Sequence, residues 1–333
     1  MSLFMLAAYG FACAAVYHLC PAKIRWVILL LASYGFYASR SLAGLPFILV
    51  TTGTTWLAAL AIARIGEGGK ARLKAAEKER KKAIRAAARR RQRAVMLAAL
   101  LLNFGLLAVL KYTDDVRGWF GASPLGLLLP LGISFYTFQS MGYLIDVYNG
   151  KYAPEKNPAK FALFVSFFPQ MVQGPISRFG DLGPQLLAGR SLDFGNLKYG
   201  IQLMLWGYFK KLVIADRAAV LVSSVLDHPW DHSGSILAVG VLFYCIQLYG
   251  DFSGGIDITR GVAKLFGIDL AENFRRPLYA TSLTDFWRRW HITLGTWMRD
   301  YLFYPLSLSK PFGKLGKLTR RHIKGKLGKI LPT

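Results

Sequence analysis

Long apolar blocks, rather than a single amphipathic face, dominate the pattern of hydrophobic and polar positions along the chain. The first third of the chain contains four runs that are nearly free of charge. Several of them are close to, or slightly below, the roughly 17 residues that a transmembrane helix needs. We therefore predict four membrane-spanning helices in this part of the chain. The runs are Leu3–Leu19, Trp26–Ala38, Leu45–Ala63 and Ala94–Leu110.

The next apolar stretches differ, because they carry proline, glycine and amide side chains inside them. At membrane depth an interrupted helix is tolerated only where protein or a water-filled cavity covers its backbone. Residues 125–147 and 161–172 are therefore predicted to be short, broken or re-entrant helices around an internal tunnel. Gln170, Gln173 and Arg178 are expected to lie at the mouth of this tunnel.

Two longer apolar runs, residues 201–225 and 235–250, are predicted to be further spans. The second run ends at the motif Asp251-Phe-Ser-Gly-Gly-Ile-Asp257, which places two acids and a glycine pair directly after it. Ionisable groups inside a membrane or at its edge are energetically costly, which makes them functional candidates by default. Asp251 is therefore a candidate site residue.

The composition agrees with an all-α polytopic membrane protein and excludes several other classes. Apolar residues make up 53% of the chain and charged residues 18%, against about 25% charged residues in soluble domains. Disordered and collagen-like proteins are excluded by the hydrophobicity and by the absence of a G-X-Y period. The three cysteines lie in apolar runs without a C-x-x-C pair, so the sequence predicts no disulfide framework and no metal site.

The net charge of +24 is concentrated in two short segments. Residues 64–93 contain 13 Lys and Arg against three Glu, and residues 310–329 contain eight Lys and Arg and no acid. Basic segments beside apolar spans are typical of cytoplasmic loops next to anionic lipid. We predict anionic membrane lipid as their partner, with an acidic cytoplasmic partner as the alternative. No nucleic acid ligand is expected, since no stacking aromatics interleave the basic runs.

Cytoplasmic placement of the first basic segment sets the direction of the spans before it. The third apolar run then enters the cytoplasm, which puts Lys23 and Arg25 on the cytoplasmic side and the N-terminus outside. The whole chain is predicted to form one membrane domain. Its parts are N-terminal spans (1–63), a basic cytoplasmic loop or helix (64–93), core spans and tunnel-lining segments (94–309) and a basic cytoplasmic segment (310–333).

A further helix is predicted near the end of the chain. Ser282-Leu-Thr-Asp285 fits a helix start, with Ser282 as the N-cap and Asp285 near the positive end of the helix dipole. One continuous helix is expected to run from there to about Tyr301 and to stop before Pro305.

The period of this helix predicts a polar face that holds Arg288 and His291, with Trp287 beside His291. Trp290 lies on a neighbouring apolar stripe. This face fits the border of a polar tunnel. It equally fits an aromatic belt at the membrane interface, with the arginine reaching to headgroups and a hydrogen-bonded histidine. The complete polar face is Thr284, Arg288, His291, Gly295 and Met298.

Taken in order, these motifs resemble the membrane-bound O-acyltransferase (MBOAT) family. They are most similar to its bacterial branch, which acts in alginate O-acetylation and in D-alanyl transfer to teichoic acids. The resemblance extends over nearly the whole chain, and its most specific motif is Thr284-Asp-Phe-Trp-Arg-Arg-Trp-His291. The basic segment 64–93 is the part least typical of the family. The other matching motifs are Pro130-Leu-Gly-Ile-Ser-Phe-Tyr-Thr-Phe138, Phe168-Pro-Gln-Met-Val-Gln-Gly-Pro-Ile-Ser-Arg178, Gly250-Asp-Phe-Ser-Gly-Gly-Ile-Asp257, Glu272-Asn-Phe-Arg-Arg-Pro-Leu-Tyr279 and Trp297-Met-Arg-Asp-Tyr301.

The resemblance implies a membrane enzyme that transfers an acyl group, acetyl above all, to hydroxyl groups of an exported or cell-surface polysaccharide. The implied acyl donor is acetyl-CoA or an acylated carrier, with no tightly bound cofactor. An exported transferase is a further candidate partner. The implied location is the bacterial cell membrane.

The resemblance also implies roles for individual residues. Of two family histidines, one maps onto His291, with a supporting role. The other, the expected base, belongs to a Trp-His-Gly stretch of a later span and maps onto nothing in this chain. We therefore expect an N-terminal portion of the enzyme, or a shortened version, that is inactive alone. Arg288 is expected to steer an anionic donor or polymer, and Trp287 and Trp290 to form apolar walls. Asn273, Asp285 and Asp251 are expected to support the site or a helix terminus.

Two functions without acyl transfer remain as alternatives. A transporter or export-channel subunit for a polymer or lipid-linked substrate also needs broken helices and buried polar groups. A scaffolding membrane subunit needs no organised face of histidine and arginine.

Overall fold

The described part of the chain is almost entirely helical. The computed structural model describes residues 3–74, 76–314 and 318, and within them the β-structure is one isolated bridge. The predicted all-α fold is confirmed. The chain divides into two compact units, Met1–Ala271 and Glu272–Thr333. Of the predicted basic segment 310–333, residues 310–314 and 318 are helical, and the rest lies outside the described residues.

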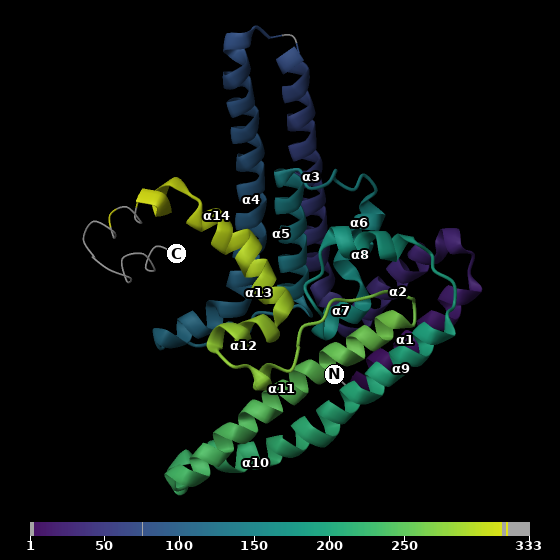
Figure 1. Cartoon of the computed structure of the whole chain (residues 1–333), viewed down its shortest axis with the longest axis vertical. Helices are drawn as coiled ribbons and strands as arrows, with labels where there is room; N and C mark the ends of the chain where they lie inside the picture. The colour runs from purple at the N-terminus through teal and green to yellow at the C-terminus, as the bar shows by residue number, and fades with distance from the viewer. Residues whose placement is uncertain (1–2, 75, 315–317, 319–333) are drawn as a thin grey trace. The chain divides into compact units, whose positions relative to one another are not determined.

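Two long helices, α3 (Leu45–Lys74) and α4 (Lys78–Trp119), lie side by side as an antiparallel hairpin in the first unit (Figure 1). Together with α11 (Gly234–Lys264), they are the three described helices long and apolar enough to cross a membrane. Of the two forms predicted for residues 64–93, a loop or a helix, residues 64–74 and 78–93 have the helix. The basic segment is the shared end of α3 and α4, where alanine, lysine and arginine favour helix formation.

The helices before this hairpin follow the predicted apolar runs closely. Helix α1 (Leu3–Leu19) has the predicted bounds, and α2 (Arg25–Arg40) is slightly longer than its apolar run. Each is followed by a short 3-10 turn, Ala22–Ile24 and Leu42–Gly44. Both apolar helices are shorter than α3, α4 and α11.

Interrupted helices follow, as the proline and glycine pattern predicts. Helix α5 begins at Ile133, after Gly132, whose φ of 68° and whose close approach to the carbonyl oxygen of Met171 leave no room for a side chain. Residues 161–172 form two helices rather than one, because the chain is extended at Phe167. The prediction of broken helices is confirmed here. The helices are α5 (Ile133–Asn149), α6 (Pro158–Ser166), α7 (Phe168–Gln173) and α8 (Phe179–Leu187).

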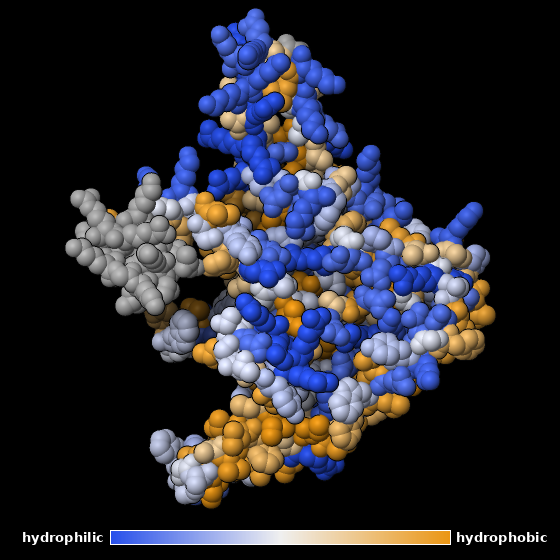
Figure 2. Space-filling view, viewed as in Figure 1, coloured by the Kyte–Doolittle hydropathy of each residue, from blue (hydrophilic) through white to orange (hydrophobic). Residues whose placement is uncertain are grey.

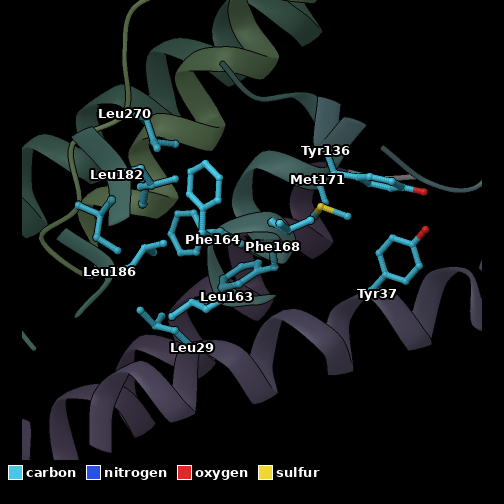
Figure 3. Packing of buried hydrophobic residues seen from close by; sticks show 14 of the residues in the cluster. Leu29, Tyr37, Tyr136, Leu163, Phe164, Phe168, Met171, Leu182, Leu186 and Leu270 are labelled. Atoms are coloured by element: carbon cyan, nitrogen blue, oxygen red, sulfur yellow. The ribbon is translucent and has the colours of Figure 1, made fainter. Parts of the chain in front are cut away.

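The core of the first unit is built on the break between α6 and α7. Phe168 is fully buried and packs edge-on against Tyr9 and Phe266. The backbone N–H that the break leaves at Phe168 donates to the hydroxyl of Ser33 (3.1 Å), so the interruption stays hydrogen-bonded. Figure 3 shows aromatic and aliphatic side chains from α2, α5, α6, α7 and α8 meeting around this point. The broken helices are therefore held by buried packing.

The segment predicted as a span over residues 201–225 is α9 (Phe194–Tyr208), a π-helix (Phe209–Ala215) and α10 (Asp216–Leu226) in direct succession. Helix α9 packs closely on α11, because a Cβ on Gly207 would lie 2.6 Å from the carbonyl oxygen of Gly254. The Asp251–Asp257 motif follows the apolar run within one helix, since α11 continues through it to Lys264. Its glycines let α9 and the π-helix approach α11 closely.

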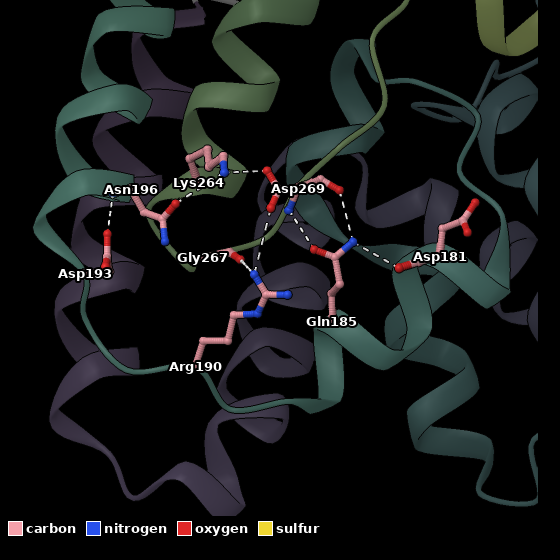
Figure 4. A network of polar contacts seen from close by, with 8 residues as sticks. All are labelled: Asp181, Gln185, Arg190, Asp193, Asn196, Lys264, Gly267 and Asp269. Atoms are coloured by element: carbon pink, nitrogen blue, oxygen red, sulfur yellow. Dashed lines mark hydrogen bonds and ion pairs between the residues drawn. The ribbon is translucent and has the colours of Figure 1, made fainter.

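A polar network ties the C-terminal end of α11 to its neighbours (Figure 4). The guanidinium of Arg190 donates to the carbonyl oxygen of Gly267 (2.5 Å), and Lys264 pairs with Asp269. Gln185 of α8 exchanges two hydrogen bonds with the backbone of Asp269, at 2.8 and 3.1 Å. These bonds fix the turn that ends the first unit.

The second unit contains short helices in place of the one predicted. The N-cap prediction is confirmed, because the Ser282 hydroxyl accepts from the backbone N–H of Asp285 (3.1 Å). The predicted continuous helix is wrong: the chain leaves helical geometry at Trp290 and His291. The predicted stop before Pro305 is also wrong, since Pro305 lies in the first turn of a helix, where its missing N–H is tolerated. The segments are α12 (Leu283–Arg289), α13 (Ile292–Met298), a π-helix (Arg299–Phe303) and α14 (Tyr304–Ser307).

Candidate functional site

A cavity of about 320 Å³ lies in the first unit where α1, α7, the first π-helix and α11 meet. Two predicted site residues, Gln173 and Asp251, line it together. The Tyr208 hydroxyl closes one side by donating to the carbonyl oxygen of Leu3 (2.9 Å). The cavity is therefore lined by both polar and apolar side chains. The remaining lining residues are Phe4, Val172, Lys211, Leu212 and Asp216.

Lys211 holds the two acids of this cavity. Its ammonium donates to Asp251 (2.5 Å) and to Asp216 (2.9 Å). The lysine belongs to the π-helix, a form that is frequent at functional sites and that turns consecutive side chains out of the α-helical register. Because all three side chains are partly exposed to the cavity, they offer a hydroxyl-bearing ligand both donors and acceptors.

The neighbouring residue of the π-helix, Lys210, points into protein. Its side chain is 9% exposed, and its ammonium donates to Asp257 (2.7 Å) and to the Ser253 hydroxyl (3.0 Å). Arg260 lies 3.6 Å from the other oxygen of Asp257. Buried charges need partners of this kind, because desolvation otherwise outweighs their attraction. The Asp251–Asp257 motif therefore supplies one carboxylate to the cavity and one to a buried ion pair.

The other predicted site residues of the first unit take part in hydrogen bonds, packing or a helix cap. Gln170 is buried and donates to the Ser177 hydroxyl (2.6 Å). The carbonyl oxygen of Gln173 accepts from Thr259 (2.9 Å), and its side chain fills the space that a Cβ on Gly255 would take. Arg178 is the N-cap residue of α8. Gln173 and Asp251 thus share the cavity, whereas Gln170 and Arg178 do not line it.

The sequence interpretation missed Lys210, Lys211 and Asp216, which it included in an apolar span. A signal for them was available, because two lysines and an acid inside a predicted span are costly unless they are paired. Their partners could not be found in the same way, since Asp257 is 47 residues away from Lys210.

In the second unit, His291 occupies the point where the helix breaks. Its φ of 43° lies in the left-handed region that residues other than glycine rarely adopt. Arg276 has a similar φ of 48°, so the unit contains both described residues of this kind apart from glycine. Such conformations persist only where surrounding contacts impose them, and they cluster at functional sites.

Asn273 supplies the contacts that impose this break. Its backbone carbonyl accepts from the N–H of Ile292 (3.0 Å), and its side-chain oxygen accepts from both the N–H (3.1 Å) and the hydroxyl (2.6 Å) of Thr293. The side chain is 1% exposed, and its amide nitrogen has no hydrogen-bond partner within the described residues. Asn273 therefore fixes the start of α13 and keeps a buried donor available.

The predicted side-by-side arrangement of Trp287 and His291 on one helical face is lost with the break. Trp287 is 63% exposed, whereas Trp290 is half-buried between Phe274 and Phe286 at ring distances of 5.0 and 5.5 Å. The backbone of Trp290 also bridges that of Phe274. Both predicted apolar walls contact Phe286, which Trp287 meets edge-on at 5.3 Å, but Trp287 keeps most of its surface exposed.

Charged groups around α12 are paired at the surface. Asp285 accepts from Arg289 (2.9 Å) and from the N–H of Thr281 (3.2 Å). The bond from Arg289 holds the pKa of the Asp285 carboxyl below its usual value.

The pKa of His291 is lowered for a different reason, because burial disfavours the charged imidazolium and so favours the neutral imidazole. Arg288 is exposed. The unit therefore holds a histidine whose neutral form is favoured at a backbone break that Asn273 fixes, and a neutral imidazole is suited to orienting a hydroxyl group or polarising a carbonyl group. No three His, Cys, Asp or Glu side chains cluster as metal ligands in the described chain.

Replacing Asn273 with Ala is expected to loosen the break. The substitution removes both bonds to Thr293 and leaves its buried N–H without an acceptor, which costs about 1–3 kcal/mol. Hydrogen exchange at the start of α13 should become faster by about tenfold or more. Asn196→Ala, in the first unit, is the matched control and should leave this exchange unchanged. Unaltered exchange in Asn273→Ala would show that other contacts hold the break.

Comparison with known proteins gives a consistent set of relatives. The sequence profile described as MBOAT, membrane-bound O-acyltransferase family, matches residues 154–320. The chain is 36% identical to a probable alginate O-acetylase of Azotobacter vinelandii, over 88% of this chain and 56% of that protein. It is 33% identical to a peptidoglycan O-acetyltransferase of Helicobacter pylori, over 84% and 55%. It is 30% identical to a teichoic acid D-alanyltransferase of Bacillus subtilis, over 54% and 46%. The chain spans about half the length of the curated relatives it matches.

Proposed function

Because this chain belongs to the membrane-bound O-acyltransferase family, we propose that the protein transfers an acyl group, acetyl above all, to hydroxyl groups of an exported or cell-surface polysaccharide. The relatives named for O-acetylation of alginate and of peptidoglycan support this substrate class. The observation that carries the proposal is the backbone break at His291, the last residue of the most specific family motif, which Asn273 holds in place. A membrane protein with this arrangement is suited to acyl transfer.

The proposed step is an ordinary acyl transfer. The acceptor hydroxyl oxygen bonds to the carbonyl carbon of a thioester donor, its proton passes to a histidine, and the donor thiolate leaves and takes up the proton. Neutral His291 orients the hydroxyl or polarises the carbonyl, in support of a base. Asn273 supports the site by holding the backbone break that positions His291. The donor is acetyl-CoA or an acylated carrier, and an exported transferase completes the set of proposed partners.

Further roles are proposed for the remaining predicted residues. Arg288, exposed on α12, steers an anionic donor or polymer, and Trp290 forms an apolar wall. Gln173 and Asp251 bind sugar hydroxyls in the cavity of the first unit. The proposed location is the bacterial inner membrane, with the N-terminus outside and the basic end of the α3–α4 hairpin in the cytoplasm.

Deletion of the complete gene in its host tests this function. We expect the ester content of the exported polysaccharide to fall to background while the amount of polymer is retained, and a plasmid copy should restore the esters. Base-labile acetate released per unit of purified polymer is the measurement. Loss of exported polymer, with normal esterification of the polymer that remains, would instead favour an export channel.

A further inference from the structure

The α3–α4 hairpin ends in a strongly basic region, which we call the basic tip and define as residues 64–74 and 78–93. Twelve of its 13 lysines and arginines are exposed, and its net charge over residues 64–93 is +10. Figure 2 shows hydrophilic side chains covering this end of the hairpin. The tip also contains no histidine and no aromatic residue. It is therefore a concentrated positive surface that the proposed acyl transfer does not use.

The length of the helices separates the tip from the membrane surface. Helix α4 continues without interruption from Lys78 to Trp119, so its basic part is coaxial with its uncharged part, residues 94–110. Residues 78–93 extend about 24 Å at about 1.5 Å per residue. The headgroup layer on each side of a bilayer is only about 5–8 Å thick. Most of the tip therefore extends beyond the headgroups, where the attraction of anionic lipid is screened within about 8 Å.

A surface cavity of about 370 Å³, open to solvent, lies between the two helices of the tip. They approach closely here, since a Cβ on Gly69 would lie 3.0 Å from that of Ala88. Arg64, Arg72 and Arg91 line the cavity, together with apolar side chains such as Ile65 and Ile84. Three guanidinium groups around an apolar floor fit a carboxylate on a short aliphatic stem, because arginine binds carboxylates by paired hydrogen bonds.

We propose that the basic tip is a docking surface for an acidic soluble protein, and that an Asp or Glu side chain of this partner enters the arginine-lined cavity. Charge complementarity selects an acidic partner. The projection beyond the headgroups favours a soluble partner over lipid, and the absence of aromatic residues disfavours a single-stranded nucleic acid, which would stack on them. The proposal does not depend on the acyltransferase function.

The first experiment measures how far the tip lies from lipid. A fluorophore is attached to a cysteine at position 83, which is exposed on the tip, after replacement of Cys13, Cys20 and Cys245. In vesicles that contain phosphatidylglycerol, a quencher on the lipid headgroup should leave this fluorophore bright. A fluorophore at position 97, exposed in the uncharged part of α4, is the control and should be quenched from the acyl chains. Headgroup quenching at position 83 would overturn the projection and the proposal.

The second experiment measures binding of fluorescent poly-L-glutamate to the full chain in nanodiscs of zwitterionic lipid. The cavity variant Arg72→Gln/Arg91→Gln should raise the Kd about tenfold. The matched control, Arg80→Gln/Arg85→Gln, makes the same charge change outside the cavity and should raise it by no more than about threefold. Both variants leave eleven basic residues in the tip. This excess of positive charge should still orient the membrane spans with the tip in the cytoplasm.

Two outcomes would overturn the proposal. Equal loss of binding in the cavity and control variants would mean that only net charge attracts the probe, with no carboxylate in the cavity. Tighter binding of phosphatidylglycerol vesicles or of oligo-dT than of poly-L-glutamate, lost in the cavity variant, would assign the cavity to a lipid or a nucleic acid instead.

Discussion

Replacing Asp257 with Ala is expected to lower the free energy of unfolding by about 3–5 kcal/mol, the usual cost of removing one partner of a buried ion pair. Lys210 is 9% exposed and donates to Asp257 at 2.7 Å, so the substitution leaves its ammonium buried without a carboxylate. Reversible denaturant unfolding in mixed micelles measures the effect. The loss should exceed that caused by alanine at Asp251, the other acid of the motif.

Two comparisons show that burial causes this loss. Asp251→Ala breaks the partly exposed pair with Lys211, whose side chains are 31% and 43% exposed, and should cost only about 0–1 kcal/mol. Lys210→Met/Asp257→Leu replaces the buried pair by apolar side chains of similar size and should recover most of the stability. If Asp257→Ala and Asp251→Ala cost the same, the pair does not act as a buried unit.

Replacing His291 with Asn, in the full chain that the gene encodes, is expected to lower polysaccharide ester content by about 10²-fold or more, the range that acid–base groups contribute. Asparagine tolerates the left-handed conformation of residue 291 better than alanine does, so the backbone break is retained while the imidazole is removed. The ester content of purified polymer, normalised to the amount of protein in the membrane, is the measurement.

The matched control is His291→Gly, which also accepts a positive φ. Both variants should keep the hydrogen-exchange pattern of α13 and lose ester formation alike. Wild-type ester levels in both would remove His291 from the mechanism and favour a scaffolding role. Loss of ester together with a loosened α13 would assign His291 to the fold rather than to the chemistry.

The dependence on pH follows from the burial of His291. Its pKa is lowered from the ordinary value, about 6.5. In the pH range just below that value, His291 is therefore less protonated in the folded protein than in the unfolded chain. The contribution to stability therefore rises with pH across this window and is constant above it. Transfer that needs the neutral imidazole should follow the same direction, and His291→Asn should flatten this limb of the profile.

The pattern of residues along the sequence correctly predicted the elements that are stabilised by contacts between sequence neighbours. The uncharged run from Leu3 to Leu19 became α1 with the same bounds, and Ser282 became the N-cap that its hydroxyl and position predict. The break after residue 166 was also readable, because proline and amides inside an apolar run mark an interruption. Helix periodicity failed at His291, since the sequence there continues a helical pattern without a gap.

The sequence by itself determined that the chain is helical and belongs in a membrane, because long uncharged runs cannot remain in water and can satisfy their backbone in lipid only as helices. Tertiary structure decided where those helices break and which charges meet. Asn273 acts on Thr293 across 20 residues, and Lys210 finds Asp257 across 47. Such contacts depend on how distant segments pack, and packing free energy overrides the weaker preferences of neighbouring residues along the chain.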